Sequence, residues 1–225
     1  MKPLFIVGCG NMALTLFAYF KEFYQVVGFA VDDNYRTTDT FLDLPVHSLE
    51  AIEKNTIPEQ SHFVVAIGFQ DMNEVRQRKF NELKHKGYLP AKLILNPQIT
   101  QHNVSIGAGS AILDNTSIHA GTVVGENTFI STGVNIGHGC RIGNNVWINS
   151  GVTIAGDVVI GDNTVIGVGA NIGNNIEIAE YNFIGAGSLV VKTTEKYDTF
   201  AVRQTEKLAI MSKQFLQLSN IYRSR

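Results

Sequence analysis

A six-residue period dominates the C-terminal half of the chain. From Ile106 to Val190, every sixth residue is Ile or Val without a break. Neither a helix (period 3.6) nor an ordinary strand (period 2) produces this spacing. One inward aliphatic side chain per six residues predicts a short strand followed by a corner, and three such repeats close a triangular coil of eighteen residues. The sequence therefore predicts a parallel β-helix, with these inward positions: Ile106, Ile112, Ile118, Val124, Ile130, Ile136, Ile142, Ile148, Ile154, Ile160, Ile166, Ile172, Ile178, Ile184 and Val190.

Two further columns keep the same register. The residue two positions before each aliphatic is mostly small or β-branched, which suits a narrow interior. The residue three positions after it is Gly, Asn or Asp in all cases but one, and these residues tolerate a positive φ. We therefore expect the chain to turn a corner at each repeat, since a low-complexity tract would not hold three columns in register. The corner positions are Gly109, Asn115, Gly121, Asn127, Gly133, Gly139, Asn145, Gly151, Asp157, Asn163, Gly169, Asn175, Tyr181 and Gly187.

The N-terminal part of the chain has a different pattern. Apolar runs at residues 4–7, 26–31, 63–67 and 93–95 predict strands, and residues 11–20 and 72–86 predict helices. Strands that alternate with helices indicate a small parallel α/β sheet of Rossmann-like type. The Asn96-Pro97 pair breaks this pattern. We therefore expect an α/β domain at residues 1–95 and a β-helix at residues 96–192.

The six-residue period stops at about residue 192. Beyond it, apolar residues recur at helical spacing, which predicts a C-terminal amphipathic helix. Because the end of a solenoid exposes its core, we expect this helix to cover the open end, with residues 193–225 as a capping segment. The apolar stripe consists of Leu208, Met211, Phe215, Leu218 and Tyr222.

Composition excludes several classes of protein. The net charge of −2 and the pI near 6.3 give no reason to expect a nucleic acid or an anionic membrane as partner. No stretch approaches the roughly 20 apolar residues that span a bilayer, and the N-terminus lacks the apolar run of a signal peptide. Cys9 and Cys140 are the only cysteines, so no disulfide framework is expected. These features favour a reduced, cytoplasmic protein.

A glycine-rich turn follows the first predicted strand. Such a turn before a helix points backbone N–H groups at an anion, but the third glycine of the dinucleotide fingerprint is missing, so a full NAD site is not expected. Acids after the second strand suit a ribose hydroxyl or a base edge, and a glycine after the third strand permits close approach of a ligand. A nucleotide-diphosphate site and an ordinary tight turn with solvated acids both remain open. The candidate residues are Gly8, Gly10, Asn11, Met12, Asp32, Asp33 and Gly68.

One histidine in the β-helix has a distinctive position. His138 follows Ile136 by two residues, so its side chain should point outward at a corner. The residues one coil away, Ala120 and Gly156, are small and leave space over the imidazole. An imidazole accepts a proton near neutral pH, and the Gly156 N–H is a candidate oxyanion donor. A general base and a plain surface histidine both fit this spacing. No metal site is expected, because the histidines are not spaced for shared coordination.

These residues resemble a known family. The Ile-Gly repeats, preceded by a small α/β domain, are similar to bacterial nucleotide-sugar acetyltransferases of the PglD and NeuD type, which have a left-handed β-helix. The resemblance covers nearly the whole chain. It implies a homotrimer in which the α/β domain binds the nucleotide of the sugar, through Gly10, Asn11, Met12, Asp32, Asp33 and Gly68.

The resemblance also implies roles in the β-helix. The family's catalytic histidine falls on His138, within Ile136-Gly137-His138-Gly139-Cys140, and its oxyanion glycine falls on Gly156. Acetyl-CoA would lie between coils of adjacent subunits. Its contacts would be near Trp147, Gly156, Val168 and Ala186.

Three departures from the family pattern stand out. The acid that usually follows the catalytic histidine is Gly139 here, and a second histidine that contacts acetyl-CoA in some relatives is Trp147. The Val-Pro-Ala segment that usually closes the β-helix is replaced by residues 200–204, Phe-Ala-Val-Arg-Gln. The first departure removes the group that makes the imidazole a stronger base.

The resulting hypothesis is an acetyl-CoA-dependent N-acetyltransferase, with no metal, that acts on a nucleotide-linked amino sugar in surface-glycan or lipopolysaccharide biosynthesis. One alternative is O-acetylation of a sugar or sialic acid. A hydroxyl is a poorer nucleophile than an amine and depends more on the base, so the glycine at position 139 favours the amine. The other alternative is a non-catalytic subunit that binds a sugar nucleotide or serves in assembly.

Overall fold

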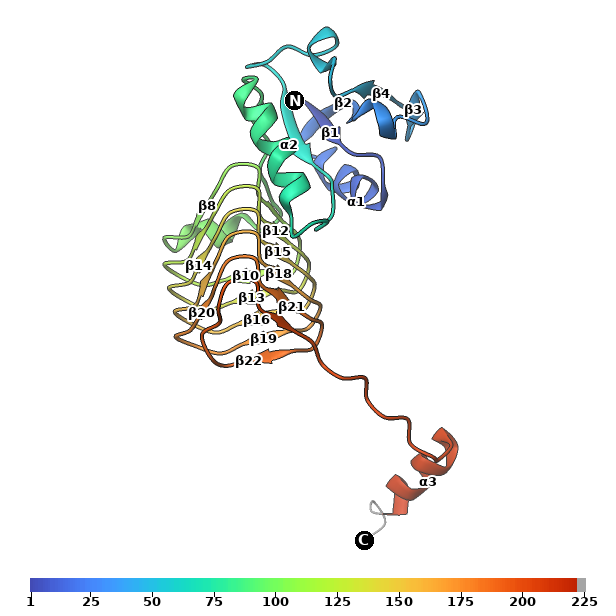
Figure 1. Cartoon of the computed structure of the whole chain (residues 1–225), viewed down its shortest axis with the longest axis vertical. Coiled ribbons are helices and arrows are strands. Elements are labelled where there is room, and N and C mark those ends of the chain that lie inside the picture. The colour runs from blue at the N-terminus through green and yellow to red at the C-terminus, as the bar shows by residue number, and fades with distance from the viewer. Residues whose placement is uncertain (222–225) are drawn as a thin grey trace.

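The chain forms an α/β domain followed by a three-sided β-helix and a C-terminal helix (Figure 1). The computed structural model describes residues 1–221. In the α/β domain the strands are β1 (Lys2–Val7), β2 (Tyr24–Val31), β3 (Thr40–Phe41), β4 (Leu44–Ser48), β5 (His62–Val65) and β6 (Leu89–Pro90), and the helices are α1 (Asn11–Phe20) and α2 (Glu74–His85). Short 3₁₀ turns occupy Asp33–Tyr35, Ile52–Lys54 and Pro97–Gln101.

The sheet of the α/β domain has the order β3-β4-β2-β1-β5-β6. Its pairs are parallel except β3 with β4, which form an antiparallel hairpin at the edge. The expected parallel α/β sheet is therefore confirmed for its centre, and the hairpin makes the whole sheet mixed. Because β2, β1 and β5 are neighbours and parallel, their carboxyl ends lie at one edge, where Val31, Val7 and Val65 precede the predicted ligand residues.

The β-helix has three faces, each named here after its central strand. The β13 face contains β10 (Ser117–Ile118), β13 (Asn135–Ile136), β16 (Thr153–Ile154), β19 (Asn171–Ile172) and β22 (Leu189–Val190). The β14 face contains β8 (Ser105–Ile106), β11 (Val123–Val124), β14 (Arg141–Ile142), β17 (Val159–Ile160) and β20 (Glu177–Ile178). The β15 face contains β7 (Leu93–Ile94), β9 (Ala111–Ile112), β12 (Phe129–Ile130), β15 (Trp147–Ile148), β18 (Val165–Ile166), β21 (Phe183–Ile184) and β23 (Thr199–Phe200).

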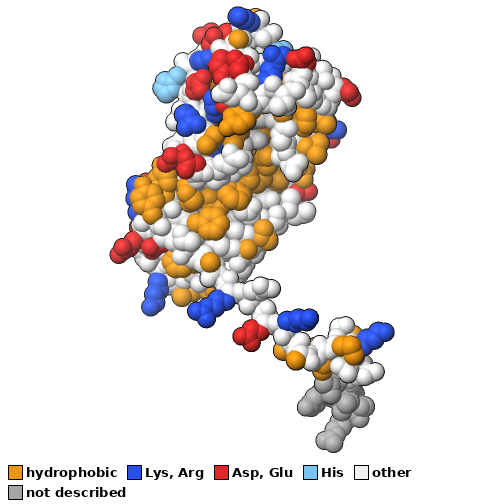
Figure 2. All heavy atoms as spheres, turned by 45° about the vertical axis from the view of Figure 1, so that its right-hand side comes forward, with side chains coloured by type: hydrophobic (Ala, Val, Ile, Leu, Met, Phe, Trp, Pro, Cys, Tyr) orange, Lys and Arg blue, Asp and Glu red, His pale blue; other side chains and the backbone are white. Residues whose placement is uncertain are grey.

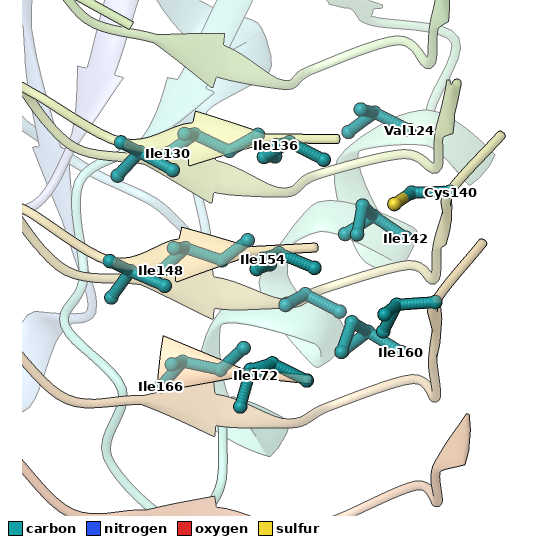
Figure 3. Packing of buried hydrophobic residues seen from close by; sticks show 14 of the residues in the cluster. Val124, Ile130, Ile136, Cys140, Ile142, Ile148, Ile154, Ile160, Ile166 and Ile172 are labelled. Atoms are coloured by element: carbon teal, nitrogen blue, oxygen red, sulfur yellow. The ribbon is translucent and has the colours of Figure 1, made fainter. Parts of the chain in front are cut away.

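Strand pairing confirms the eighteen-residue coil. Asn135 pairs with Thr153 and Trp147 with Val165, each eighteen residues further along the chain. The inward aliphatics stack in columns, and Figure 3 shows Ile130, Ile148 and Ile166 one above another. Every predicted corner residue has a positive φ, including Tyr181 at 58°.

One strand assignment from the sequence is wrong. We expected residues 93–95 to end the α/β sheet, but Leu93–Ile94 pairs with Ala111–Ile112 as the first strand of the β15 face. The pattern of a two-residue apolar strand does not say which sheet it joins. The last strand of the α/β sheet is instead β6, which pairs with β5.

The α/β domain covers the β15 face. The outward residues Phe129, Trp147 and Val165 are buried there, in one cluster with Leu4, Leu16 and Phe29 of the α/β domain. On the β13 and β14 faces the outward residues, such as Thr153 and Arg141, are exposed. The two domains therefore share a core.

Helix α2 runs along the corner between the β14 and β15 faces. The repeat distances of the two structures are similar, so successive turns of the helix lie beside successive coils. The pitch of an α-helix is about 5.4 Å and the strand spacing about 4.8 Å. Phe80 lies over Gly109, and a Cβ at position 109 would lie 2.3 Å from its ring. One turn earlier, Arg76 donates to the carbonyls of Asn127 and Asn145, at 2.8 and 3.3 Å. One more turn earlier, the Asn73 side chain donates to the carbonyl of Asn163 at 3.3 Å.

The C-terminal helix α3 (Ser212–Ile221) does not form the expected cap. Residues 201–211 lead away from the prism and place α3 beyond its end (Figure 1). Leu208, Met211 and Phe215 are exposed. The last coil is closed instead by β23, where Phe200 packs against the β-helix core. The side chain of Leu218 and the whole of Tyr222 lie outside the described part of the chain.

Within residues 1–221, none of the helices combines the length and apolar character needed to cross a bilayer. The surface view shows charged side chains gathered on the α/β domain, with hydrophobic side chains exposed over the middle of the molecule (Figure 2).

Candidate active site

His138 lies at the corner between the β13 and β14 faces. Its side chain is 68% exposed, and backbone hydrogen bonds fix the register around it. The Asp157 N–H donates to the His138 carbonyl at 2.8 Å, and the Gly139 N–H donates to the Ala120 carbonyl at 3.0 Å. Ala120, His138 and Gly156 thus form one column, as expected from the period.

The imidazole lies directly against Gly156. A Cβ at position 156 would be 2.7 Å from both Cε1 and Nε2 of His138, closer than atoms can approach. Only glycine therefore leaves room for the ring in this position. The Gly156 N–H has no acceptor among residues 1–221. An imidazole and a backbone N–H without an acceptor thus lie side by side at an exposed corner.

Asp157 is a neighbour of the histidine that was not among the predicted site residues. Its Oδ2 lies 3.6 Å from Nδ1 of His138, and its side chain is about half exposed, at 53%. The signal was present in the sequence, since residue 157 lies one coil and one residue after His138. Cys140 is buried behind the corner, where burial raises the pKa of its thiol. It is therefore a protonated core residue rather than a nucleophile.

The residues predicted to contact acetyl-CoA lie apart from His138 in a single chain. Val168 and Ala186 are exposed in successive coils at the corner between the β15 and β13 faces, where the Gly187 N–H donates to the Val168 carbonyl at 2.8 Å. Trp147 is only 6% exposed under the α/β domain. Its ring centroid lies 4.3 Å from that of Phe129 and 5.6 Å from that of Phe69. Trp147 therefore has almost no free surface for a ligand.

The glycine turn lies at the carboxyl edge of the α/β sheet. Gly8 has φ +117°, and a Cβ there would lie 2.9 Å from the Ala66 carbonyl oxygen, so glycine is required. Helix α1 follows with Gly10 as N-cap, no side-chain cap and no acid in its first turn. Its first N–H groups, from Asn11 and Met12, are therefore available to an anion.

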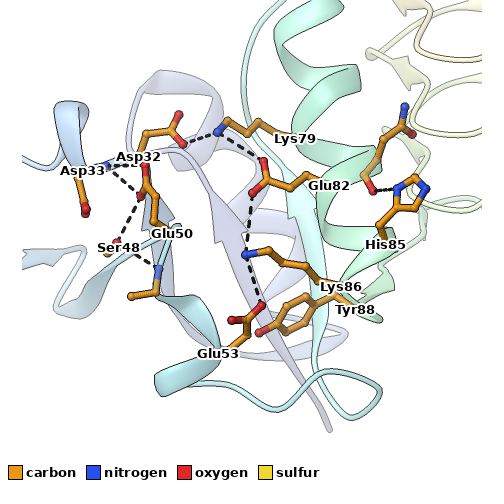
Figure 4. Close-up of polar contacts among 12 residues, drawn as sticks. Asp32, Asp33, Ser48, Glu50, Glu53, Lys79, Glu82, His85, Lys86 and Tyr88 are labelled. Atoms are coloured by element: carbon orange, nitrogen blue, oxygen red, sulfur yellow. Dashed lines mark hydrogen bonds and ion pairs between the residues drawn. The ribbon is translucent and has the colours of Figure 1, made fainter.

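Asp32 and Asp33 have different surroundings (Figure 4). The carboxylate of Asp32 is paired with Lys79 of α2, which also lies 3.7 Å from Glu82. The side chain of Asp33 is exposed, and its backbone N–H donates to Glu50 at 3.2 Å. Asp33 also lines a hollow of about 270 Å³ together with residues 36–39. Asp33, rather than Asp32, has a carboxylate free to accept hydrogen bonds from a ligand.

Gly68 lies in the segment after β5 and is surrounded by open space. A Cβ added there, or at Gly10, would meet no atom within 4 Å. Both glycines therefore border free volume at the edge where the sheet ends. In the described part of the chain, residues 1–221, no three His, Cys, Asp or Glu side chains group as a metal site would require.

With this geometry established, the comparisons with known proteins define the class. The model of the PglD N-terminal domain matches residues 3–83, and the model of the bacterial transferase hexapeptide (six repeats) matches residues 121–156 and 139–174. The chain is thus a left-handed β-helix protein with hexapeptide repeats and a PglD-type N-terminal domain, as the sequence predicted. Among curated proteins, none matches the sequence.

The solved structures that match both domains of this chain include the two that follow. One is the acetyltransferase domain of PglB from Neisseria gonorrhoeae, with 24% identity and a TM-score of 0.75 over 88% of this chain and 96% of that chain. The same domain has been solved in complex with acetyl coenzyme A. The other is a perosamine N-acetyltransferase from Caulobacter crescentus, solved as a histidine-to-asparagine variant with CoA and GDP-perosamine. It has 22% identity and a TM-score of 0.75 over 90% of this chain and 92% of that chain.

Proposed function

We propose that this protein is an acetyl-CoA-dependent N-acetyltransferase that acts on the amine of a nucleotide-linked amino sugar. The observation that carries the proposal is the His138 imidazole lying on Gly156 at an exposed corner, in a chain with a PglD-type N-terminal domain. An acetyltransferase needs a base and an oxyanion donor together. This corner provides both.

In the proposed reaction, Nε2 of His138 accepts a proton from the sugar amine as the nitrogen attacks the thioester carbonyl carbon. The carbon–nitrogen bond forms, and the carbonyl oxygen becomes an oxyanion within reach of the Gly156 N–H. Such a donor contributes about 2.7–4 kcal/mol to the transition state. The carbon–sulfur bond then breaks, and the leaving thiolate of CoA takes up a proton from the imidazolium.

The α/β domain would bind the nucleotide. The free N–H groups of Asn11 and Met12 suit a diphosphate, and Asp33 suits a ribose hydroxyl or a base edge. The open space at Gly10 and Gly68 leaves room for the ligand. The β-helix would carry the chemistry.

A homotrimer is part of the proposal. Within one chain, His138 lies at a different corner from Val168 and Ala186. A neighbouring chain packed beside the His138 corner would bring its own Val168 and Ala186 there and complete an acetyl-CoA site. The product would enter surface-glycan biosynthesis in the cytoplasm.

The test is release of free CoA thiol from acetyl-CoA in the presence of UDP-, dTDP- and GDP-linked amino sugars. We expect thiol release with at least one of them and its loss in His138→Ala. Full turnover in His138→Ala would refute the mechanism. Retained nucleotide binding with no thiol released from any sugar would favour a non-catalytic binder. Acetylation of a hydroxyl, identified by mass spectrometry of the product, would favour the O-acetyltransferase.

A further inference from the structure

Residues 138–139 and 156–157 form a two-by-two pattern across adjacent coils. The upper pair is His138-Gly139 and the lower pair is Gly156-Asp157. The two polar side chains lie on one diagonal, and the carboxylate reaches Nδ1 of the imidazole at 3.6 Å. The two glycines lie on the other diagonal.

Each glycine makes room for the polar side chain of the other coil. A Cβ at position 156 would lie 2.7 Å from the imidazole, and a Cβ at position 139 would lie 2.2 Å from Oδ1 of Asp157. An acid at position 139 therefore cannot coexist with Asp157 in its present position. Both corner residues have positive φ, +67° for Gly139 and 57° for Asp157. Asp is one of the few residues besides Gly that tolerates this conformation.

We propose that Asp157 is the positioning residue of His138 and takes the place of an acid at position 139. This inference rests on the proposed function. With the carboxylate at Nδ1, the imidazole keeps its proton on that nitrogen, and Nε2 is left unprotonated as the base. Nε2 is one of the ring atoms that lie against Gly156, beside the candidate oxyanion donor.

The separation of 3.6 Å is longer than a hydrogen bond. Catalytic hydrogen bonds are often long in the free enzyme and shorten in the complex. Both side chains are exposed, so a substrate that covers the corner would remove water and strengthen their attraction. The carboxylate also stabilises the imidazolium that forms when His138 takes the proton.

Asp157 is the acid that the structure assigns to this histidine. Among residues 1–221, no other carboxylate lies within 4.0 Å of the imidazole. The nearby thiol of Cys140 is neutral, since burial raises its pKa. The glycine at position 139 therefore does not leave the base without a partner.

The kinetic test is Asp157→Asn, which keeps the shape and removes the charge. We expect kcat/KM to fall about 10- to 100-fold, within the range that general acid–base catalysis supplies, with the KM for acetyl-CoA unchanged. Asp157→Glu, which retains the carboxylate, should recover part of the activity.

The matched control is Asp162→Asn. Asp162 also bridges two coils, since its Oδ1 accepts from the Asn144 N–H at 2.7 Å, but it lies at another corner. Its loss should lower stability and leave kcat/KM unchanged. If Asp157→Asn behaves like Asp162→Asn, then Asp157 is only a structural residue and the proposal is overturned.

A second readout does not depend on turnover. Nitrogen-15 NMR of the histidine ring should show the proton on Nδ1 of His138 in the wild type and a shift toward the Nε2-protonated tautomer in Asp157→Asn. The same tautomer in both proteins would overturn the inference, even if His138→Ala abolishes thiol release. Conversely, a tautomer change in a protein that acetylates no sugar would support the pairing while the proposed function fails.

Discussion

Arg76 and Trp147 face each other across the junction of the two domains, with the guanidinium carbon 5.2 Å from the centroid of the indole ring. Arg76 is buried, and no carboxylate pairs with it among residues 1–221. Its partners are the carbonyls of Asn127 and Asn145. Burial lowers its pKa to about 9, which leaves it charged at neutral pH. A buried cation thus fastens α2 to the β-helix corner.

Arg76→Ala should loosen this junction. The change leaves two buried carbonyls without donors and removes a guanidinium from the face of Trp147, so the free energy of unfolding should fall by about 1–3 kcal/mol. Urea unfolding followed by tryptophan fluorescence measures this directly, because Trp147 is the only tryptophan. The exposed Arg78 of the same helix supplies the control, and equal effects of Arg78→Ala and Arg76→Ala would contradict the role given to the junction.

Gly156→Ala should displace the imidazole. The added methyl group would occupy space 2.7 Å from Cε1 and Nε2 of His138, so the ring must rotate away from the oxyanion donor. We expect kcat to fall about 100-fold, as for loss of one oxyanion contact, with little change in thermal stability because the ring is exposed. Gly173→Ala is the control, since its methyl group would lie 3.2 Å from the side chain of the exposed Val191. An active Gly156→Ala would show that the ring position is not used.

Gly68→Val should affect substrate binding and little else. Position 68 borders open space in the free protein, so the melting temperature should change little. If the nucleotide occupies that space, the KM for the nucleotide sugar should rise about tenfold, equivalent to about 1.4 kcal/mol of lost binding. The KM for acetyl-CoA should stay the same. An unchanged KM for both substrates would place the nucleotide elsewhere.

His62 should make the protein less stable at mildly acidic pH. Burial, followed by the charge of Lys2, lowers the pKa of His62, and a hydrogen bond to Pro3 opposes them. The folded state therefore binds fewer protons than the unfolded state, whose histidine titrates near 6.5. The contribution is fully present above that value and is lost as the pH falls through it toward the folded-state pKa.

The test for His62 is His62→Phe, which keeps a ring beside Tyr24, now 5.5 Å away between centroids. Urea unfolding at pH 7, 6 and 5 should show a smaller loss of stability in the variant. Part of the pH dependence of stability should remain in His62→Phe, because burial also lowers the pKa of His47. The exposed His102 provides the comparison, through His102→Gln. If the free energy of unfolding falls as steeply with decreasing pH in His62→Phe as in His102→Gln, then His62 is not the source of the acid sensitivity.

The β-helix could be predicted from the sequence because its determinants are local. Each corner needs a residue that tolerates a positive φ, and each strand of a coil needs an inward aliphatic residue. The residue type at one position is therefore enough to assign that position to a corner or to the core. The burial of Ile136, Ile148 and Ile154 follows directly. His138 and Gly156 could be paired because the period fixes which residues meet one coil apart.

The packing of one element against another could not be predicted from the sequence. The sequence of Leu93–Ile94 does not determine whether this strand pairs with β9 or with the α/β sheet. Likewise, the apolar stripe of α3 does not determine which surface the helix packs against. The packing of the α/β domain on the β15 face, by contrast, could have been predicted, because large apolar residues recur every eighteen residues in outward positions of that face. These residues are Phe129, Trp147, Val165 and Phe183. Asp157 was not predicted as a site residue because its partner, His138, lies diagonally across coils and not in the same column.

The contacts of Arg76 place the domain junction at the same height as the candidate active site. His138 lies in the single turn of the solenoid that runs from Asn127 to Asn145, the two residues whose carbonyls Arg76 holds. The reach from the α/β domain to the imidazole is therefore set by the width of the triangle and not by the number of stacked turns. Duplication of turns beyond this level would lengthen the molecule without changing the distance between the α/β domain and the imidazole.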